Sequence, residues 1–186
     1  MITTPDGAIE VNGRSRPLGG PADQAHLIAL RERASVVLVG AGTARGEGYG
    51  APSKVGLRIG VVTHSCSMDF SSPLFTSGAG FIITTTYAPI VPVDSIRAGD
   101  TAINFADVIS QLPDGVIHVE GGPQLNAALL NADLVDAINL TFSAKLVGAR
   151  GLSISHAPHI LRRFRLNSVV ERDNFVFARY ERVTTA

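Results

Sequence analysis

The stretch Val116-Ile117-His118-Val119-Glu120-Gly121-Gly122-Pro123 carries the strongest fold signal in this chain. Its short apolar run predicts a buried strand over 116–119, and Gly122 with Pro123 predicts the first turn of a helix. Backbone amides at a helix N-terminus are unpaired, and glycine lets an anion approach them without a Cβ atom in the way. A plain turn would use the same residues, so anion binding and a structural turn both remain open here.

A second glycine-rich junction, Gly40-Ala41-Gly42-Thr43, follows a strand predicted over 35–40. Ligands of open α/β sheets bind at the carboxyl ends of parallel strands, so we expect the two junctions to lie side by side and to hold one ligand. Neither junction contains the Gly-x-Gly-x-x-Gly fingerprint or a P-loop with its Lys and Ser/Thr. The common Rossmann and phosphate-hydrolysing sites are therefore excluded.

The rest of the chain alternates predicted strands with predicted helices. Further buried strands are expected over 58–63 and 80–86, and helices over 21–34, over 105–112 and from Gly122 onward. This order predicts an α/β fold with a mixed, mostly parallel central sheet flanked by helices. The last third instead predicts antiparallel strands over 137–147, 166–172 and 175–183, with a tight turn near Asp173. We expect one domain over 1–186, because no repeat or linker interrupts the pattern.

Composition limits the function classes. Sixteen basic residues balance sixteen acidic ones, so no overall field attracts nucleic acid or an anionic membrane. No apolar run reaches the roughly 18 residues that a membrane span requires. The single cysteine, Cys66, excludes an internal disulfide and a zinc site of paired thiolates, and it suits a reducing cytoplasm. The first residues show no signal-peptide pattern, so we expect a soluble cytoplasmic protein.

Ordered motifs along the whole chain resemble the pyrimidine reductases of riboflavin biosynthesis. They are Thr4-Pro5-Asp6-Gly7, Gly13-Arg14-Ser15, Leu30-Arg31, Val39-Gly40-Ala41-Gly42-Thr43, Val119-Glu120-Gly121-Gly122-Pro123, Leu134-Val135-Asp136 and Lys145-Leu146-Val147-Gly148. Glu47-Gly48-Tyr49 is similar to the stand-alone branch of that family. The resemblance implies a dihydrofolate-reductase-like fold and an enzyme that uses NADPH to reduce the ribosyl group of 5-amino-6-(5-phosphoribosylamino)uracil to ribityl. It also implies a homodimer.

The resemblance assigns roles to individual positions. Asp6 is the expected catalytic residue, near the reacting carbon. On the substrate side the matching residues are Ser15, Arg31 and Glu120. Those implied for the cofactor are Ile2, Thr43, Glu47, Thr63, Gly121, Gly122, Pro123, Gln124 and Leu125. The residue types suit these roles, because an arginine offers a planar fork to a phosphate and a carboxylate accepts from hydroxyl or N–H groups.

Structural interpretations stand beside the functional ones. Asp6 can equally be a turn residue that bonds local backbone, and without the resemblance Arg31 would be taken for a solvated helix charge. His64, His118, His156 and His159 lack the spacing of a metal site. Lys145 is expected to be a surface or strand-edge cation rather than a Schiff-base lysine.

Two rival functions and one structural feature remain to be tested. A pocket of this kind could reduce dihydrofolate or another small heterocycle, or the chain could be an inactive nucleotide-binding or oligomeric protein. No zinc-deaminase signature is present, which leaves a reductase alone. Met1-Ile2-Thr3 is expected to be the end of a strand whose beginning is absent. In the family's fold that strand is central, so its neighbours should carry unpaired backbone groups.

Overall fold

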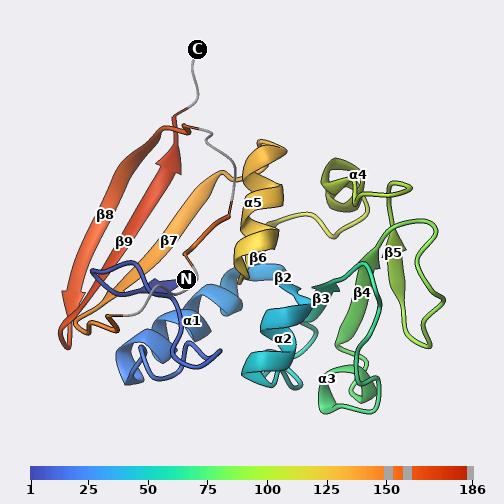
Figure 1. Cartoon of the computed structure of the whole chain (residues 1–186), viewed down its shortest axis with the longest axis horizontal. Helices are drawn as coiled ribbons and strands as arrows, with labels where there is room; N and C mark the ends of the chain where they lie inside the picture. The colour runs from blue at the N-terminus through green and yellow to red at the C-terminus, as the bar shows by residue number, and fades with distance from the viewer. Residues whose placement is uncertain (149–152, 157–160, 184–186) are drawn as a thin grey trace.

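The computed structural model describes residues 1–148, 153–156 and 161–183, and its strands form two sheets with helices packed against them (Figure 1). In chain order the elements are β1 (Ile2–Thr3), α1 (Pro21–Arg33), β2 (Ala34–Gly40), α2 (Ala41–Glu47), β3 (Arg58–Val62), α3 (Pro73–Thr76), β4 (Gly80–Thr84), β5 (Ser95–Arg97), α4 (Phe105–Ser110), β6 (Val116–Val119), α5 (Pro123–Asn131), β7 (Ala137–Ser143), β8 (Phe164–Arg172) and β9 (Phe175–Arg182). None of the helices within these ranges is both long and apolar enough to span a bilayer.

The first sheet is wholly parallel and has the strand order β5-β4-β3-β2-β6. Its β-branched strands alternate along the chain with helical segments. Each helical segment serves as a crossover connection, so that successive strands can pair in parallel. Alternate residues of β2 face opposite layers. Val37 and Val39 pack with α2 and α3, whereas Val36 and Leu38 pack with α4 and α5. In Figure 1, α4 and α5 accordingly lie above this sheet and α2 and α3 below it.

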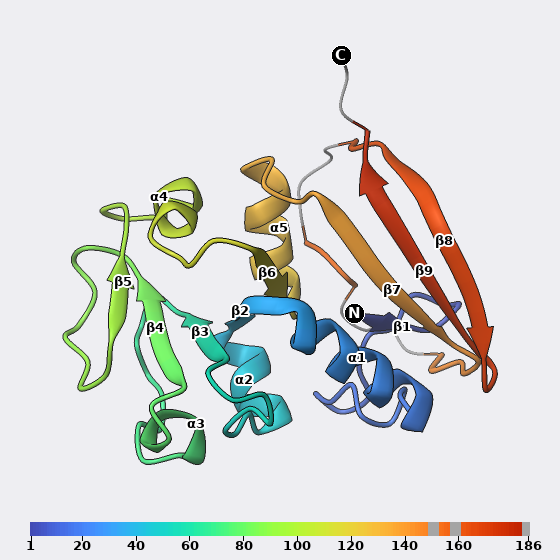
Figure 2. The ribbon, with the colours of Figure 1, turned by 180° about the vertical axis from the view of Figure 1, so that it is seen from behind.

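The second sheet has the order β1-β7-β9-β8 and is antiparallel apart from β1, which pairs in parallel with β7. Asp173 and Asn174 both have positive φ, which is the conformation that a two-residue hairpin turn requires. The predicted turn and the antiparallel C-terminal strands are confirmed. Figure 2 shows this sheet from behind, beside α1 and α5.

One prediction about the sheet needs correction. A buried strand was expected over 116–119, yet Val116 is 54% exposed and Ile117, His118 and Val119 are only half-buried. The reason lies in β1, which contains only Ile2 and Thr3 and pairs with β7 alone. Because β1 does not bridge β6 and β7, the expected central sheet is divided in two, and β6 lies at an edge.

Three elements were not anticipated as regular structure. The sequence predicts only a glycine-rich junction over 40–43, but residues 41–47 form the helix α2, whose C-cap Gly48 has a left-handed conformation. The short α3 and the edge strand β5 were also missed. Short elements give little periodicity, so their existence depends on packing rather than on local sequence. Helix α2 packs against β2 and β3, whereas α3 and β5 pack against β4.

Gly60 in β3 offers a direct test of the core. A Cβ atom there would lie 2.7 Å from Cζ of Phe81 and 2.8 Å from Cδ1 of Ile83. We expect Gly60→Ala to lower the free energy of unfolding by about 1–3 kcal/mol, because a well-packed core resists an added methyl group. Urea unfolding measures the change. Gly50→Ala is the control, since Gly50 has open space around it, and equal stabilities of the two variants would contradict the packing described.

Candidate active site

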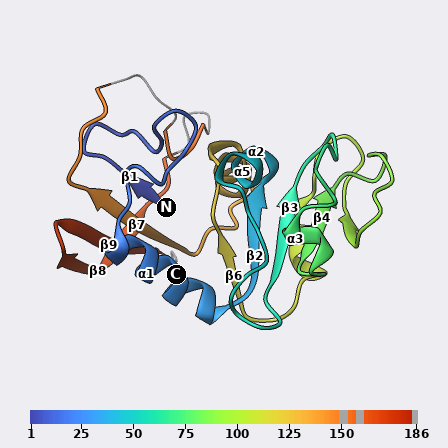
Figure 3. The ribbon, with the colours of Figure 1, turned by 90° about the horizontal axis from the view of Figure 1, so that it is seen from below.

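The two glycine-rich junctions are in direct contact. The backbone N–H of Gly40 donates to the carbonyl oxygen of Gly121 at 2.6 Å. A Cβ atom at Gly122 would lie 2.7 Å from Oγ1 of Thr43, so only glycine fits at that position without displacing the threonine. Figure 3 shows α2 and α5 beginning at the same end of β2. The prediction that the two strand ends lie side by side is confirmed.

A cavity of about 900 Å³ opens at these strand ends. This volume falls within the range of small-molecule and cofactor sites, about 300–1,000 Å³. The residues expected from the sequence that line it are Ile2, Ser15, Thr43, Glu47, Thr63, Glu120, Gly122, Pro123, Gln124 and Leu125. Gly121, Arg31 and Asp6 are not among its lining residues. The cavity thus brings together most of the expected cofactor side and part of the substrate side.

Helix α5 begins at this cavity in a way that suits an anionic group. Gly122 is its N-cap and makes no side-chain capping bond, and Pro123 occupies the first turn. The first amides of a helix without a side-chain cap are free to bind a ligand, and the helix dipole favours a negative charge there. Gln124 and Leu125, in the same turn, also line the cavity. The residues present therefore fit a pyrophosphate at this point.

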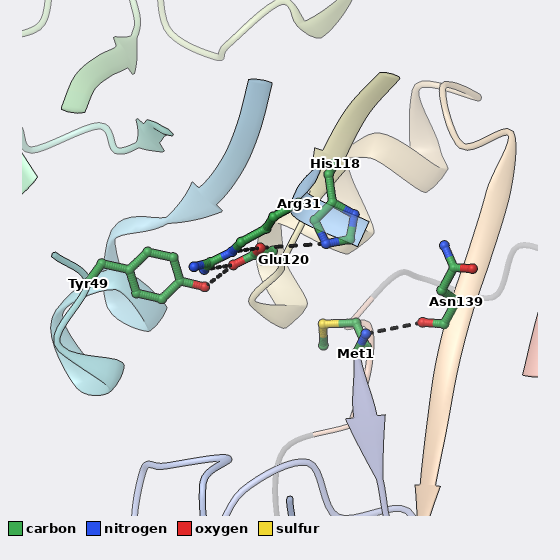
Figure 4. A network of polar contacts seen from close by, with 6 residues as sticks. All are labelled: Met1, Arg31, Tyr49, His118, Glu120 and Asn139. Carbon is green, nitrogen blue, oxygen red and sulfur yellow. Dashed lines mark hydrogen bonds and ion pairs between the residues drawn. The ribbon is translucent and has the colours of Figure 1, made fainter. Parts of the chain in front are cut away.

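Glu120 is the centre of the strongest polar network in the cavity (Figure 4). Arg31 donates to it twice, from Nε to Oε1 at 2.7 Å and from the terminal Nη2 to Oε2 at 2.6 Å. The hydroxyl of Tyr49 donates to Oε2 as well. Nε2 of His118 lies 3.5 Å from Oε1. The Glu120 side chain is only 5% exposed, so three side chains, one each from α1, the segment after α2, and β6, meet around one buried carboxylate.

The surroundings of Glu120 hold it in the ionised form. Burial alone would raise its pKa, but the hydrogen bonds and charge of Arg31 and the hydroxyl of Tyr49 outweigh burial and lower the pKa below its usual value. The pKa of Arg31 is raised, chiefly by its bonds to Glu120. Burial raises the pKa of Tyr49 well above its usual value, and burial lowers the pKa of His118. Glu120 is thus an ionised acceptor held by the cation of Arg31 and the hydroxyl of Tyr49.

Arg31 is more closely tied to Glu120 than the sequence suggested. Its planar fork already holds a carboxylate through two charge-assisted bonds, the arrangement that an incoming phosphate would otherwise use. Its guanidinium also lies over the Tyr49 ring, 5.4 Å from the centroid. The arginine therefore orients Glu120, while the carboxylate faces the cavity.

Asp6 lies outside the cavity lining and connects two loops. Its carboxylate accepts from the backbone N–H groups of Val147 at 3.1 Å and Gly148 at 2.8 Å, and from the hydroxyl of Thr4. The bond from Thr4 and then those from the backbone lower its pKa. These contacts match the interpretation of Asp6 as a turn residue bonded to backbone, and its expected catalytic role gains no support from its position.

Three more of the expected residues have defined contacts. The backbone N–H of Ser15 donates to Oε1 of Glu47 at 2.6 Å, which ties the loop before α1 to the end of α2. Thr63 is buried at the end of β3, and its hydroxyl accepts from the N–H of Cys66. Lys145, expected at the surface, donates to the carbonyl oxygens of residues 17, 18 and 19.

Sequence reasoning did not assign a ligand-binding role to several lining residues. His26, Leu27 and Leu30 on α1, Tyr49 after α2, and His118 on β6 all face the cavity. The spacing of His26 and Leu30, four residues apart on one helix face, could have indicated a shared surface. No sequence signal shows that this face lies against a cavity rather than a sheet.

Comparisons with known proteins agree with the geometry. A family described as the RibD C-terminal domain matches residues 1–177. The fold is shared with a pyrimidine reductase-like protein from Corynebacterium diphtheriae, with TM-score 0.83 and 24% identity over 99% of this chain and 90% of that one. The comparison with curated proteins found no match.

Two further solved structures place the chain within a wider fold. A Thermotoga maritima diaminohydroxyphosphoribosylaminopyrimidine deaminase/5-amino-6-(5-phosphoribosylamino)uracil reductase gives TM-score 0.75 and 18% identity, covering 98% of this chain but 55% of that one. An Enterococcus faecalis dihydrofolate reductase gives TM-score 0.61 and 14% identity over 97% and 92% of the two chains. The fold is therefore dihydrofolate-reductase-like, as the resemblance implied.

The Glu120 network generates a stability test with a defined pH dependence. We expect Glu120→Gln to lower the free energy of unfolding at pH 7 by about 3 kcal/mol, because Arg31 then lacks its counter-charge. Tyr49→Phe removes one hydrogen bond and should cost about 1 kcal/mol. Urea unfolding of both variants measures the difference.

Acid should reduce the cost of Glu120→Gln. The folded pKa of Glu120 is lowered from 4.5, so the stability it contributes is fully present above that value and is lost as pH falls through the folded pKa. The gap between wild type and Glu120→Gln should therefore be constant near neutrality and shrink below pH 4.5. A gap no larger than that of Tyr49→Phe, or one that persists unchanged in acid, would contradict the network.

Proposed function

Because the chain belongs to the RibD C-terminal domain family of reductases, we propose that it is a cytoplasmic, NADPH-dependent reductase of 5-amino-6-(5-phosphoribosylamino)uracil. The observation that carries the proposal is the contact between Gly40 and Gly121, which joins two junctions whose residues Gly40 and Gly122 line one cavity. Two strand ends without bulky side chains leave room for a dinucleotide to extend across them. The name of the Thermotoga relative supplies the substrate proposed here.

The cofactor side of the proposal uses the residues around the two junctions. The free amides of the first turn of α5 and the close approach allowed by Gly122 would hold the pyrophosphate of NADPH. Thr43 and Glu47 on α2 and Ile2 on β1 also line the cavity, and Thr63, which follows β3, would hold the adenosine part. When bound, the cofactor would supply the hydride, and solvent one proton, for reduction of the ribosyl group to ribityl.

On the substrate side, Glu120 is the group that contacts the ligand. A buried, ionised carboxylate accepts hydrogen bonds and cannot donate them, so it selects hydroxyl or N–H groups of a ribosylaminopyrimidine. Arg31 and Tyr49 fix its orientation and thereby align the ribose with the nicotinamide, which is how positioning contributes to catalysis. Ser15, flanked by the exposed Arg14 and Arg16, is the proposed position of the substrate phosphate.

A second candidate substrate is dihydrofolate. The match to a dihydrofolate reductase over 97% of the chain favours a pocket that could accept another heterocycle. A carboxylate such as Glu120 can accept from a pterin N–H as well as from a uracil. Fold alone does not choose between them.

A homodimer accompanies the proposed function. Leu166, Val169 and Val170 on β8 are all more than half exposed, and β8 lies at the edge of its sheet. An apolar edge strand of this kind favours pairing between copies of a chain.

The test is an absorbance assay of NADPH oxidation with 5-amino-6-(5-phosphoribosylamino)uracil, with dihydrofolate, and with NADH in place of NADPH. We expect turnover of the ribosylaminopyrimidine phosphate with NADPH. Turnover of dihydrofolate alone would establish the second candidate. Binding of NADPH without oxidation in the presence of either substrate would show an inactive nucleotide-binding protein.

Arg31→Gln separates two roles for the arginine in the same assay. If Arg31 positions Glu120, the variant should lose about ten-fold or more in kcat/KM on both the phosphorylated substrate and its dephosphorylated form. If Arg31 holds the phosphate, only the phosphorylated substrate should be affected. Tyr49→Phe is the matched variant, because it disturbs Glu120 without altering any positive charge.

A further inference from the structure

The carboxylate of Glu120 has little capacity left to accept hydrogen bonds. Its two oxygens offer about four lone-pair positions in all. Oε2 accepts from Nη2 of Arg31 and from the hydroxyl of Tyr49, and Oε1 accepts from Nε of Arg31 (Figure 4). Nε2 of His118 lies 3.5 Å from Oε1 and has no hydrogen-bond partner among the described residues. Within that part of the chain, both positions on Oε2 are taken and one position on Oε1 is open.

Tyr49 is held in the place from which its hydroxyl occupies Oε2. It follows Gly48, the C-cap of α2, and its backbone N–H donates to the carbonyl oxygen of Ala44 at 3.0 Å. Its ring packs against the core cluster of β2 and β3, and the guanidinium of Arg31 lies over the ring. Burial raises the pKa of the hydroxyl, which keeps it protonated and able to donate. A ligand would have to displace a packed side chain to reach this position on Oε2.

Heterocycles differ in the donors that they present along one edge. The uracil ring of the proposed substrate has a lone N–H at N3, flanked by the carbonyl groups at C2 and C4. A pterin such as dihydrofolate instead carries an amino group at C2, beside the N–H at N3, and so presents two neighbouring donors. Two neighbouring donors suit both oxygens of a carboxylate, whereas a lone donor needs only one.

We propose that Tyr49 is a specificity-determining residue of the cavity, because its hydroxyl occupies Oε2 of Glu120 and leaves the carboxylate one open position for a ligand. This inference rests on the function proposed above, in which Glu120 contacts the substrate. The open position on Oε1 accepts the lone N3–H of a uracil. An amino group at C2 would be brought against Oε2, which already accepts two hydrogen bonds. A buried donor left unpaired is costly, so the cavity discriminates against 2-amino heterocycles.

The side chains that hold Glu120 offer such an amino group no substitute acceptor. Arg31 carries donors only. A side-chain hydrogen bond also links Arg31 to Tyr49, and because a guanidinium only donates, the phenolic oxygen is the acceptor of that bond. The arrangement therefore favours the ribosylaminouracil over dihydrofolate, although both are heterocycles with an N–H at N3.

Two ligands that differ only at C2 test the proposal. One is 5-amino-6-(5-phosphoribosylamino)uracil, and the other is its analogue with an amino group in place of the C2 oxygen. Isothermal titration calorimetry of the full chain, with no cofactor added, gives both dissociation constants without turnover. We expect the wild type to bind the uracil compound about ten-fold or more tightly than the amino analogue, because one donor of the analogue stays unpaired.

Tyr49→Phe should bring the ratio of the two dissociation constants close to one, through tighter binding of the amino analogue, because a position on Oε2 becomes open. Tyr87→Phe is the matched control. Tyr87 is 79% exposed and does not line the cavity, so its variant should keep the wild-type ratio. Equal ratios in the wild type and Tyr49→Phe, or no preference in the wild type, would overturn the proposal. Urea unfolding checks that both variants are folded.

The same ligands separate a failure of this inference from a failure of the proposed function. A preference for the uracil compound that depends on Tyr49, without oxidation of NADPH, would overturn the reductase activity and leave the role of Tyr49 standing. Oxidation of NADPH with equal kcat/KM for the two ligands would do the reverse. Absence of binding by both ligands would overturn the contact between Glu120 and the heterocycle, and the role of Tyr49 with it.

Discussion

The hydrogen bond from Gly40 to Gly121 is the constraint on which the site depends. It joins the end of β2 to the turn after β6 and brings the start of α2 against the start of α5. A side chain at Gly122 would displace Thr43, so the two turns can meet only because neither carries bulk at the point of contact. The cavity, the free amides of α5 and the position of Glu120 all follow from that approach.

Glu120 shows how the fold keeps a buried carboxylate ionised and holds it in one orientation. Burial disfavours the charged form of a carboxylate. The bidentate bonds from Arg31 and the hydroxyl of Tyr49 offset the cost of burial and hold both carboxylate oxygens in place. A buried polar network of this kind fixes one orientation of its side chains, because every member must keep its hydrogen-bond partner. The same network leaves Arg31 little freedom to bind a second anion, so the arginine that orients Glu120 is distinct from the carboxylate that is proposed to contact the ligand.

Much of this arrangement could be predicted from the sequence, and what could not has physical causes. The strand over 116–119 and the helix after Gly122 were predictable because proline and glycine mark the junction. The adjacency of the two glycine junctions followed from the rule for parallel strands. The pairing of Arg31 with Glu120 was not predictable, because residues 89 positions apart give no local signal. The exposure of Val116 escaped prediction because it depends on the position of β6 at the edge of its sheet rather than on the residue itself.

The most direct test of the central claim is hydrogen–deuterium exchange of the whole chain with and without NADPH. If the two junctions form one dinucleotide site, exchange should slow on NADPH addition at both 40–43 and 121–125 with the same dependence on NADPH concentration. Protection of only one junction, or protection confined to other parts of the chain, would contradict the claim.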